Sequence, residues 1–354
     1  MNKKPLILKL SLADKILFLK NLSLLLKSGL SLTESLSTIN NNTKSSTLKY
    51  ILTNSIDAVE RGKFLANSLS DYGNILGSLT ISIIKVGELT GNLIENLETL
   101  SEELKKIERI RRKLITTMIY PTFLISIMIV ISLLIIYFLF PKLLPIFENL
   151  GVDLPFTTVV FISIVKFLSQ YGLYILLILI FLTLNILLGL RNKKFKYFFD
   201  LFLLRVPLLS GLIKKYNLVQ FSRSMGLLLK SGIKIIEALD LAAQSLGNLV
   251  FQKIIKGASN FVIEGHSISE YLSKYQWLFP FNYIKLIEVG EQTGNLENNF
   301  FYLSNNYEEE LDSEIERFVN SLEPIILIIM SIIVGFMAIS IIMPIYEISD
   351  KLQG

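Results

Sequence analysis

The octapeptide VGELTGNL, residues 86–93, returns as VGEQTGNL at residues 289–296. Seven of the eight letters agree, and the second copy lies 203 positions after the first. The same shift aligns LLLKSGLSLTESL (24–36) with LLLKSGIKIIEAL (227–239), and it aligns Phe18 with Phe221. Because the alignment runs without a gap from residue 18 to residue 141, it predicts a duplicated structural unit.

Each copy has the pattern of a helical domain. In KILFLKNLSLLLKSG (15–29), apolar residues recur at helical spacing up to Gly29, and Gly232 takes the same place in the second copy. Glycine suits the left-handed position just after a helix. Ser31 and Glu34 have the spacing of a capping box, which predicts the start of the next helix. We predict about six short helices in each copy, the first beginning near Ser11.

The octapeptide itself is predicted to be a turn between helices. We expect an apolar helix to end at its first glycine and a long polar helix to begin a few residues later. Threonine and asparagine can cap free N–H groups, and a carboxylate is favourable near the positive end of the second helix. A tight turn is favoured over a ligand site, the alternative. The turn residues are Gly87, Glu88, Thr90, Gly91 and Asn92, and Gly290, Glu291, Thr293, Gly294 and Asn295.

The composition indicates a membrane protein. Of 354 residues, 51% are hydrophobic and only 18% are charged, which is too apolar for an ordinary soluble enzyme. Three stretches are long enough to span a bilayer and apolar on every face, and we assign membrane helices to 118–140, 172–190 and 322–343. Prolines are predicted to mark the boundaries of these spans: Pro121, Pro141, Pro155, Pro324 and Pro344.

Basic residues predict the orientation. They gather before the first span (105–113) and after the second (191–196), while only Lys142 and Lys166 are basic in between. The positive-inside rule then gives an all-α polytopic protein of the inner (cell) membrane with a cytoplasmic N-terminus. Residues 1–117 and 191–320 would form homologous cytoplasmic helical bundles, 141–171 an external loop with an amphipathic helix, and 344–354 a short external tail. This placement also explains the net charge of +5 without nucleic-acid binding.

Few residues suit catalysis or metal binding. The chain has no cysteine and one histidine, His266, and it lacks the phosphate-binding motif GxxxxGK[ST]. We therefore predict no catalytic, cofactor or metal site, and we interpret the acidic run 307–316 as a solvated helix face. A small transporter or channel subunit is the alternative function, since internal repeats are typical of transporters. The apolar stretches of these spans, 122–140, 172–190 and 325–343, carry no charged residue for an ion pathway, which favours a different role.

With these features, the chain resembles the platform proteins of type II secretion and type IV pilus systems, the GspF/PilC family, which includes competence pseudopilus members. The resemblance rests on Leu24–Gly29, Leu227–Gly232, the two octapeptides and PKLLPIFENLGVDLPFTT (141–158). It implies a non-enzymatic membrane platform between a cytoplasmic assembly ATPase and pilins or pseudopilins drawn from the lipid bilayer. It also implies contacts with other inner-membrane assembly proteins and with further copies of the chain.

The helices expected after the two octapeptides differ in charge. In the alignment of the two copies, Lys105 corresponds to Glu308, Arg109 to Asp312 and Lys113 to Glu316. One interpretation is that only the first copy obeys the positive-inside rule. The other is that the two helix faces meet, within one chain or between protomers, and that charge complementarity selects the pairing.

Overall fold

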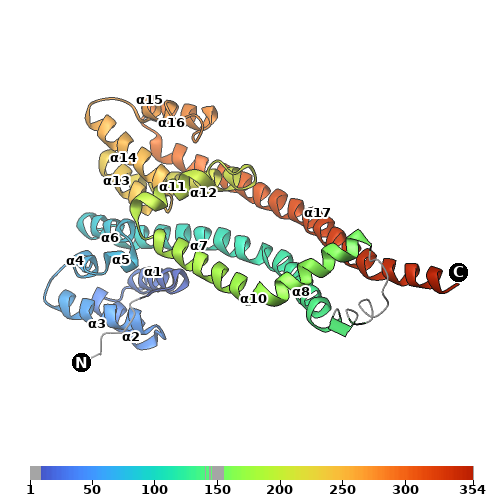
Figure 1. Ribbon diagram of the computed structural model, residues 1–354. Helices are drawn as coiled ribbons and strands as arrows, with labels where there is room; N and C mark the ends of the chain where they lie inside the picture. Colours follow the sequence, from blue (N-terminus) through green and yellow to red (C-terminus); the bar gives the residue numbers. More distant parts are fainter. Residues whose placement is uncertain (1–8, 140, 143–144, 146–154, 354) are drawn as a thin grey trace. The chain divides into compact units, whose positions relative to one another are not determined.

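The computed structural model describes residues 9–139, 141–142, 145 and 155–353, and the regular structure in these residues is helical (Figure 1). The chain divides into two compact units. Unit 1 combines Met1–Lys113 with Lys196–Glu314, and unit 2 combines Leu114–Phe195 with Ile315–Gly354.

Unit 1 contains the helical domain of each copy of the repeat, up to Lys113 and Glu314. The first copy consists of α1 (Leu12–Lys27), α2 (Leu32–Asn42), α3 (Ser46–Glu60), α4 (Leu65–Ser70), α5 (Gly73–Leu76), α6 (Ser78–Thr90) and the start of α7 (Leu93–Thr117). The second consists of α12 (Pro207–Lys230), α13 (Ile235–Ser245), α14 (Leu249–Ile263), α15 (Ile268–Ser273), α16 (Phe281–Thr293) and the start of α17 (Leu296–Gln353), preceded by α11 (Lys193–Leu203). Shifting α2, α3, α4 and α6 by 203 residues gives the bounds of α13, α14, α15 and α16, so the repeat is structural as well as sequential.

The local signals that start and end these helices act as predicted. Ser11 caps α1 by accepting a hydrogen bond from Asp14 N–H, and Ser31 and Glu34 form both halves of a capping box at α2. Gly29 and Gly232 follow α1 and α12 in the left-handed region, with φ of +88° and +83°. A residue without a Cβ adopts this conformation without steric cost.

Each repeat has its own apolar core. In the first, Phe18 and Leu22 of α1 are buried with Leu36 of α2. In the second, aromatic rings occupy much of the core, and Phe221 of α12 meets Phe300 of α17 edge-to-face at 5.6 Å between ring centroids. Such burial is the main favourable term for helices this short, because isolated short helices are marginal in water.

Unit 2 consists of long apolar helices. It contains α8 (Ile119–Leu134), the π-helical turn η1 (Ile135–Leu139), α10 (Phe156–Gly189) and the C-terminal part of α17. A small core joins η1, α10 and α17 through Ile136, Phe161 and Met337. Thr158 Oγ1 also donates a hydrogen bond of 2.9 Å to the carbonyl of Ser340. Hydroxyl groups that bond across helices are a common way to join apolar helices.

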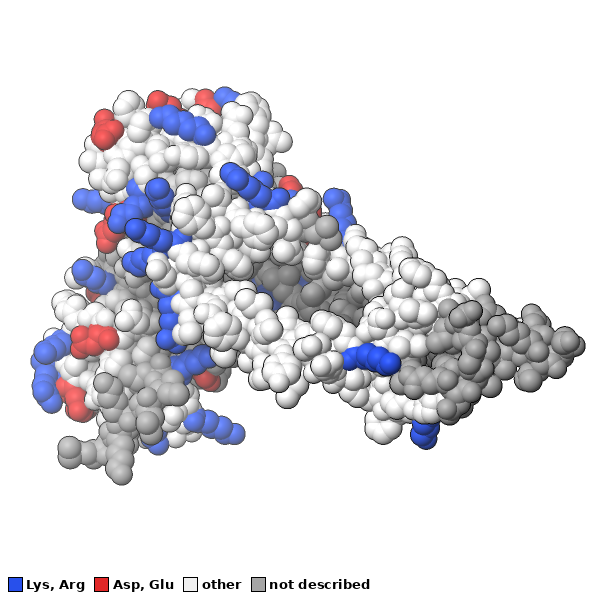
Figure 2. Space-filling model, in the orientation of Figure 1, with Lys and Arg blue, Asp and Glu red and all other residues white. Residues whose placement is uncertain are grey.

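Among the residues that the structure describes, three helices can cross a membrane by length and composition: Leu93–Phe138, Phe156–Gly189 and Leu296–Pro344. Each contains one of the predicted spans, apart from the last residues of the first two. In Figure 2, charged side chains gather over unit 1, whereas the visible surface of unit 2 carries few. This contrast fits one unit in water and the other in lipid.

The predicted boundary at residue 172 does not appear as a break. The helix α10 begins at Phe156 and continues through Gly172, so the second half of the predicted loop 141–171 and the predicted span 172–190 form one helix of 34 residues. Residues 156–171 contain no proline and a single charge, Lys166, so nothing in them stops a helix. The rest of that predicted loop lies largely outside the described residues.

The prolines lie in different helical environments. Pro121 is buried in the first turn of α8, and Pro155 is the N-cap of α10. Pro324 and Pro344 lie inside α17, which continues through both. Pro141 is exposed and helical.

Candidate functional site

The octapeptide has a different geometry from the predicted one. The helices α6 and α16 continue through Gly87 and Gly290 and end at Thr90 and Thr293. The left-handed residues are the second glycines, Gly91 and Gly294, with φ of +78° and +68°. The prediction that each helix ends at the first glycine is therefore wrong, because glycine inside a helix lowers stability without stopping it.

The first glycine is needed for close packing. A Cβ on Gly87 would lie 2.9 Å from the Cα of Leu93, the first residue of α7. A Cβ on Gly290 would lie 3.2 Å from the Cα of Leu296. The two glycines therefore let the long helix cross close to the preceding one.

The other polar residues of the octapeptide also bond differently. The Thr90 hydroxyl donates to the carbonyl of Val86 in its own helix, at 2.8 Å, instead of capping the next helix. The corresponding bond in the second copy, from Thr293 to Val289, is 2.7 Å long. Asn92 and Asn295 precede the long helices, and their carbonyls accept the N–H groups four residues on. The expected threonine cap is wrong, because the hydroxyl reaches a carbonyl of its own last turn.

Glu88 joins parts of the bundle that are distant in sequence. Its carboxylate accepts hydrogen bonds from the N–H groups of Leu65 and Ala66, at 2.6 and 2.7 Å, at the start of α4. Glu291 accepts the equivalent pair at the start of α15, at 2.5 and 3.1 Å. The carboxylates thus cap these short helices and not the long helices that follow the octapeptide. In both repeats the octapeptide is a structural joint between three helices.

The most buried charged cluster lies where the two repeats meet. Arg223 of α12 is only 1% exposed, although its side chain is charged. Its Nε lies 2.8 Å from a carboxylate oxygen of Glu103 on α7, and its Nη2 donates a hydrogen bond of 2.6 Å to Glu308 on α17. The Nε contact is an ion pair without hydrogen-bond geometry, and Nη1 lacks a hydrogen-bond partner among the described residues. Carboxylates from both repeats therefore hold one guanidinium, so loss of either would leave a buried charge less well compensated.

Ser222, the neighbour of Arg223 on α12, forms a buried hydroxyl pair with Tyr283 of α16. The hydroxyl oxygens of Ser222 and Tyr283 are 2.6 Å apart, and the ring of Tyr283 meets that of Tyr307 edge-to-face at 5.3 Å. Burial raises the pKa of Tyr283 far above its usual range, and burial is also the main reason that the pKa of Tyr307 is raised to about 12. Both phenols stay protonated at neutral pH, so this cluster is a fixed polar layer.

A charge pairing between the two long helices is present at Lys113. Lys113 on α7 lies 3.3 Å from Asp312 on α17. Glu308 instead binds Arg223, while Lys105 borders a small groove beside Lys20. Arg109 and Glu316 are exposed. Within one chain, the two helix faces thus meet near Lys113, and the pairing is offset from the sequence alignment by one helical turn.

The described residues include no group of histidine, cysteine and carboxylate side chains that could hold a metal ion. His266 stacks on Phe261 at 4.3 Å between ring centroids, and its Nδ1 lies 3.6 Å from the Glu270 carboxylate. These contacts with Phe261 and Glu270 give His266 a structural role on the protein surface. The buried polar side chains described above join helices to one another.

Arg223 is the main residue that the sequence analysis missed. Its equivalent in the first repeat is Lys20, so a base recurs at one position of the helix that precedes each LLLKSG stretch. This recurrence of a basic residue was the sequence signal from which Arg223 could have been singled out. Its partner Glu103 aligns with Asn306, so comparison of the repeats alone gives no sign of the pair.

Comparison with known proteins yields one consistent family. The family model described as "Type II secretion system (T2SS), protein F" matches residues 18–141 and again residues 221–344. The chain is 27% identical to the type IV pilus assembly protein PilC of Thermus thermophilus, over 97% of this chain and 84% of that protein. It is 23% identical to PilC of Pseudomonas aeruginosa, over 95% and 90% of the two chains. It is 26% identical to the type II secretion system protein F of Aeromonas hydrophila, over 97% and 88%.

Proposed function

This chain belongs to the type II secretion system protein F family, and from that premise we propose that it couples a cytoplasmic assembly ATPase to the polymerisation of pilins or pseudopilins. Each matched segment contains one copy of the helical domain and a helix that can cross a membrane. Relatives named for pilus assembly and for type II secretion align over nearly the whole chain, which supports a role at the base of such a fibre.

The single observation that carries the proposal is the duplicated helical unit joined to apolar helices. Unit 1 offers a charged surface suited to a motor in the cytoplasm, and unit 2 offers apolar helices suited to pilins in the bilayer (Figure 2). The polar joints at Glu88, Glu291 and Arg223 would let unit 1 transmit force as a rigid body. We further propose that unit 1 is cytoplasmic, because the basic clusters flank the first two spans on that side.

We propose a role without enzymatic activity, so loss of this chain should stop assembly but not ATP hydrolysis by the partner ATPase. Deleting the gene should abolish fibre assembly or fibre-dependent secretion, and a plasmid copy should restore it. The partner ATPase, purified from the deletion strain, should still hydrolyse ATP, while the purified chain should show no nucleotide turnover. The fibres to be examined are a pilus, a secretion pseudopilus and a competence pseudopilus.

Two results would contradict this function. Fibres of normal number and length in the deletion strain would show that the chain is dispensable for assembly. ATP hydrolysis that follows the purified chain through successive columns would show that it is an enzyme in its own right.

A further inference from the structure

Within the chain, the two repeats contact each other through surfaces that are not equivalent. The α6 helix of the first repeat contacts α12 and α13 of the second. The neighbouring α7 contacts α12 through Glu103 and Arg223, and through Thr99, whose Oγ1 lies 3.4 Å from the Nζ of Lys230. The α6–α7 corner of one repeat thus covers the α12–α13 face of the other.

The exposure of identical residues at equivalent positions shows that the surfaces equivalent to this contact are not covered. Leu227 on α12 is 2% exposed, whereas Leu24, its equivalent on α1, is 48% exposed. Val86 on α6 is half-buried, whereas Val289 on α16 is 49% exposed. Each pair has the same side chain in the same motif, so the difference in exposure comes from the neighbouring element. The α1–α2 face and the α16–α17 corner therefore both remain uncovered.

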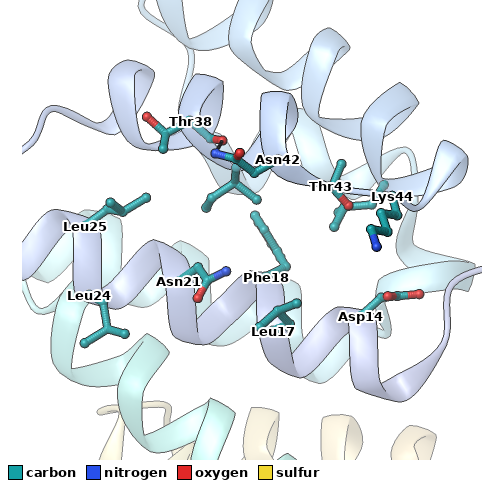
Figure 3. Close-up of a pocket in the computed structure, with 12 residues that line it drawn as sticks. Asp14, Leu17, Phe18, Asn21, Leu24, Leu25, Thr38, Asn42, Thr43 and Lys44 are labelled. Atoms are coloured by element: carbon teal, nitrogen blue, oxygen red, sulfur yellow. Dashed lines mark hydrogen bonds between the residues drawn. The ribbon is translucent and has the colours of Figure 1, made fainter.

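The uncovered side of α1 has the features of a docking surface. Leu17, Lys20, Leu24 and Lys27 follow one another at helical spacing, and we call these four residues the open face. Leu17 is 57% exposed. Beside it, a groove of about 490 Å³ separates α1 from α2, and Figure 3 shows the Phe18 ring pointing across it toward α2.

The matching surface lies on α16 and α17. Phe281, Val289 and Tyr302 are 63%, 49% and 60% exposed, and we call these three residues the free corner. Between Leu296 and Glu316, α17 carries acidic residues and no basic one, whereas the open face carries two lysines, of which Lys27 lies 3.2 Å from Glu98 of its own repeat. In the internal contact, Glu103 and Glu95 of α7 meet Arg223 and Lys230 of α12. Their equivalents on α17 are Asn306 and Asn298, so amides take the place of these two carboxylates at the free corner.

We infer that the open face of one copy binds the free corner of a second copy, repeating between chains the contact that joins the two repeats within a chain. The occupant is another copy because the chain already contains this fit once, with the same motif residues on each side. The contact is heterologous, so it leaves one surface available on each outer copy and produces a ring if the rotation closes. It does not depend on which fibre the chain helps to build.

Cysteine cross-linking of the full-length protein in native membranes tests the inference, because the natural chain has no cysteine. The internal contact supplies the calibration: Thr99→Cys with Lys230→Cys should be joined within one chain by a short thiol-specific reagent. Their equivalents are Tyr302 and Lys27. Chains with Tyr302→Cys and differently tagged chains with Lys27→Cys should be joined to each other by the same reagent when co-expressed.

Single-cysteine membranes are the matched controls. Membranes with Lys27→Cys alone, or with Tyr302→Cys alone, should give at most a small fraction of the cross-linked dimer that co-expression of the two variants gives. A dominant Lys27–Lys27 product would overturn the inference in favour of a two-fold contact. Cross-linking of Lys27→Cys mainly to a different protein would also overturn it, as would no product between chains while the internal pair reacts fully.

A charge on the open face should weaken the contact without unfolding the chain. Leu17→Glu should lower the Lys27–Tyr302 cross-link at least five-fold and leave the internal Thr99–Lys230 cross-link unchanged. Ile263→Glu is the control, since Ile263 is 62% exposed on α14, outside both surfaces. An equal loss with Ile263→Glu, or no loss with Leu17→Glu, would contradict the assignment of the surface.

Discussion

Gly87 and Gly91 stand four positions apart in one octapeptide, and each needs to be glycine for its own reason. Gly91 adopts φ of +78° and has open space around it. Gly87 has ordinary helical geometry, but a Cβ there would lie 2.9 Å from backbone of α7. The first is a conformational requirement and the second is a packing requirement.

Substitution by alanine should separate these two requirements. Gly87→Ala forces two backbones apart and should cost roughly 1–3 kcal/mol. Gly91→Ala places a side chain in the left-handed region and should cost about 1–2 kcal/mol. Gly87→Val should prevent the first repeat from folding. Thermal unfolding of the full-length protein in detergent, followed by circular dichroism, measures these losses.

Gly247→Ala is the control for these glycines, because Gly247 has open space and no left-handed φ, and it should lower stability by less than about 0.5 kcal/mol. Unchanged stability of Gly87→Ala with assembly lost would contradict the packing role and indicate a partner contact.

The residue-level predictions held for the capping box of α2 and for the glycine after α1, and they were wrong for the helix end at Gly87 and the cap at Thr90. Ser31 with Glu34, and the left-handed Gly29, depend on neighbours within a few positions. The partners of Glu88, Leu65 and Ala66, precede it by more than twenty positions, and only the folded bundle brings them to its carboxylate. Tertiary contacts of this kind have no local pattern from which they could be predicted.

At the scale of elements, α1 and α12 end in the same LLLKSG motif but lie in different environments. The α1 helix keeps one face exposed, whereas α12 is covered by its own repeat and by α6 and α7. The periodicity of the sequence predicted that both are helices. It could not predict the burial of Arg223, because that depends on which repeat supplies the covering surface.

The ion pair between α7 and α17 should respond to charge reversal. Lys113→Asp places two carboxylates together, as Lys113 and Asp312 are 3.3 Å apart, and Asp312→Lys places two ammonium groups together. Each single reversal should lower the yield of the internal Thr99–Lys230 cross-link and impair assembly, and the double reversal should restore both. The effect on stability should stay within about 1 kcal/mol, because both side chains are partly exposed.

Lys49→Asp is the control for net charge, because Lys49 has no ion pair among the described residues and lies on exposed surface of α3. It should change neither the cross-link nor assembly. A double reversal no better than the worse single variant would mean that Lys113 and Asp312 do not select the pairing. In that case the charge difference between the two helices would reflect membrane insertion alone.

At the scale of the whole molecule, the duplication and the apolar helices were predictable because both are periodic over long stretches. A shift of 203 residues relates the two matched segments of the family model, as it relates the octapeptides. The boundary between loop and span at residue 172 was not predictable, since apolar composition runs on across it and α10 follows that composition. Orientation depends on the flanking charges, which can be tested independently of the fold.

A cysteine scan tests that orientation and completes the proposal for the whole chain. Asn41 and Gln244 are exposed, equivalent positions of the two repeats, and Asn149 lies between the first two spans, outside the described residues. If the basic clusters are cytoplasmic, Asn149→Cys should react with a membrane-impermeant maleimide in intact cells. Asn41→Cys and Gln244→Cys should react only after lysis, because two spans separate the repeats and return the chain to the same side. Labelling of Gln244→Cys but not Asn41→Cys from outside would place the repeats on opposite sides. That result would be incompatible with the contact between Arg223 and Glu103, so the ion pair and the topology are tested together.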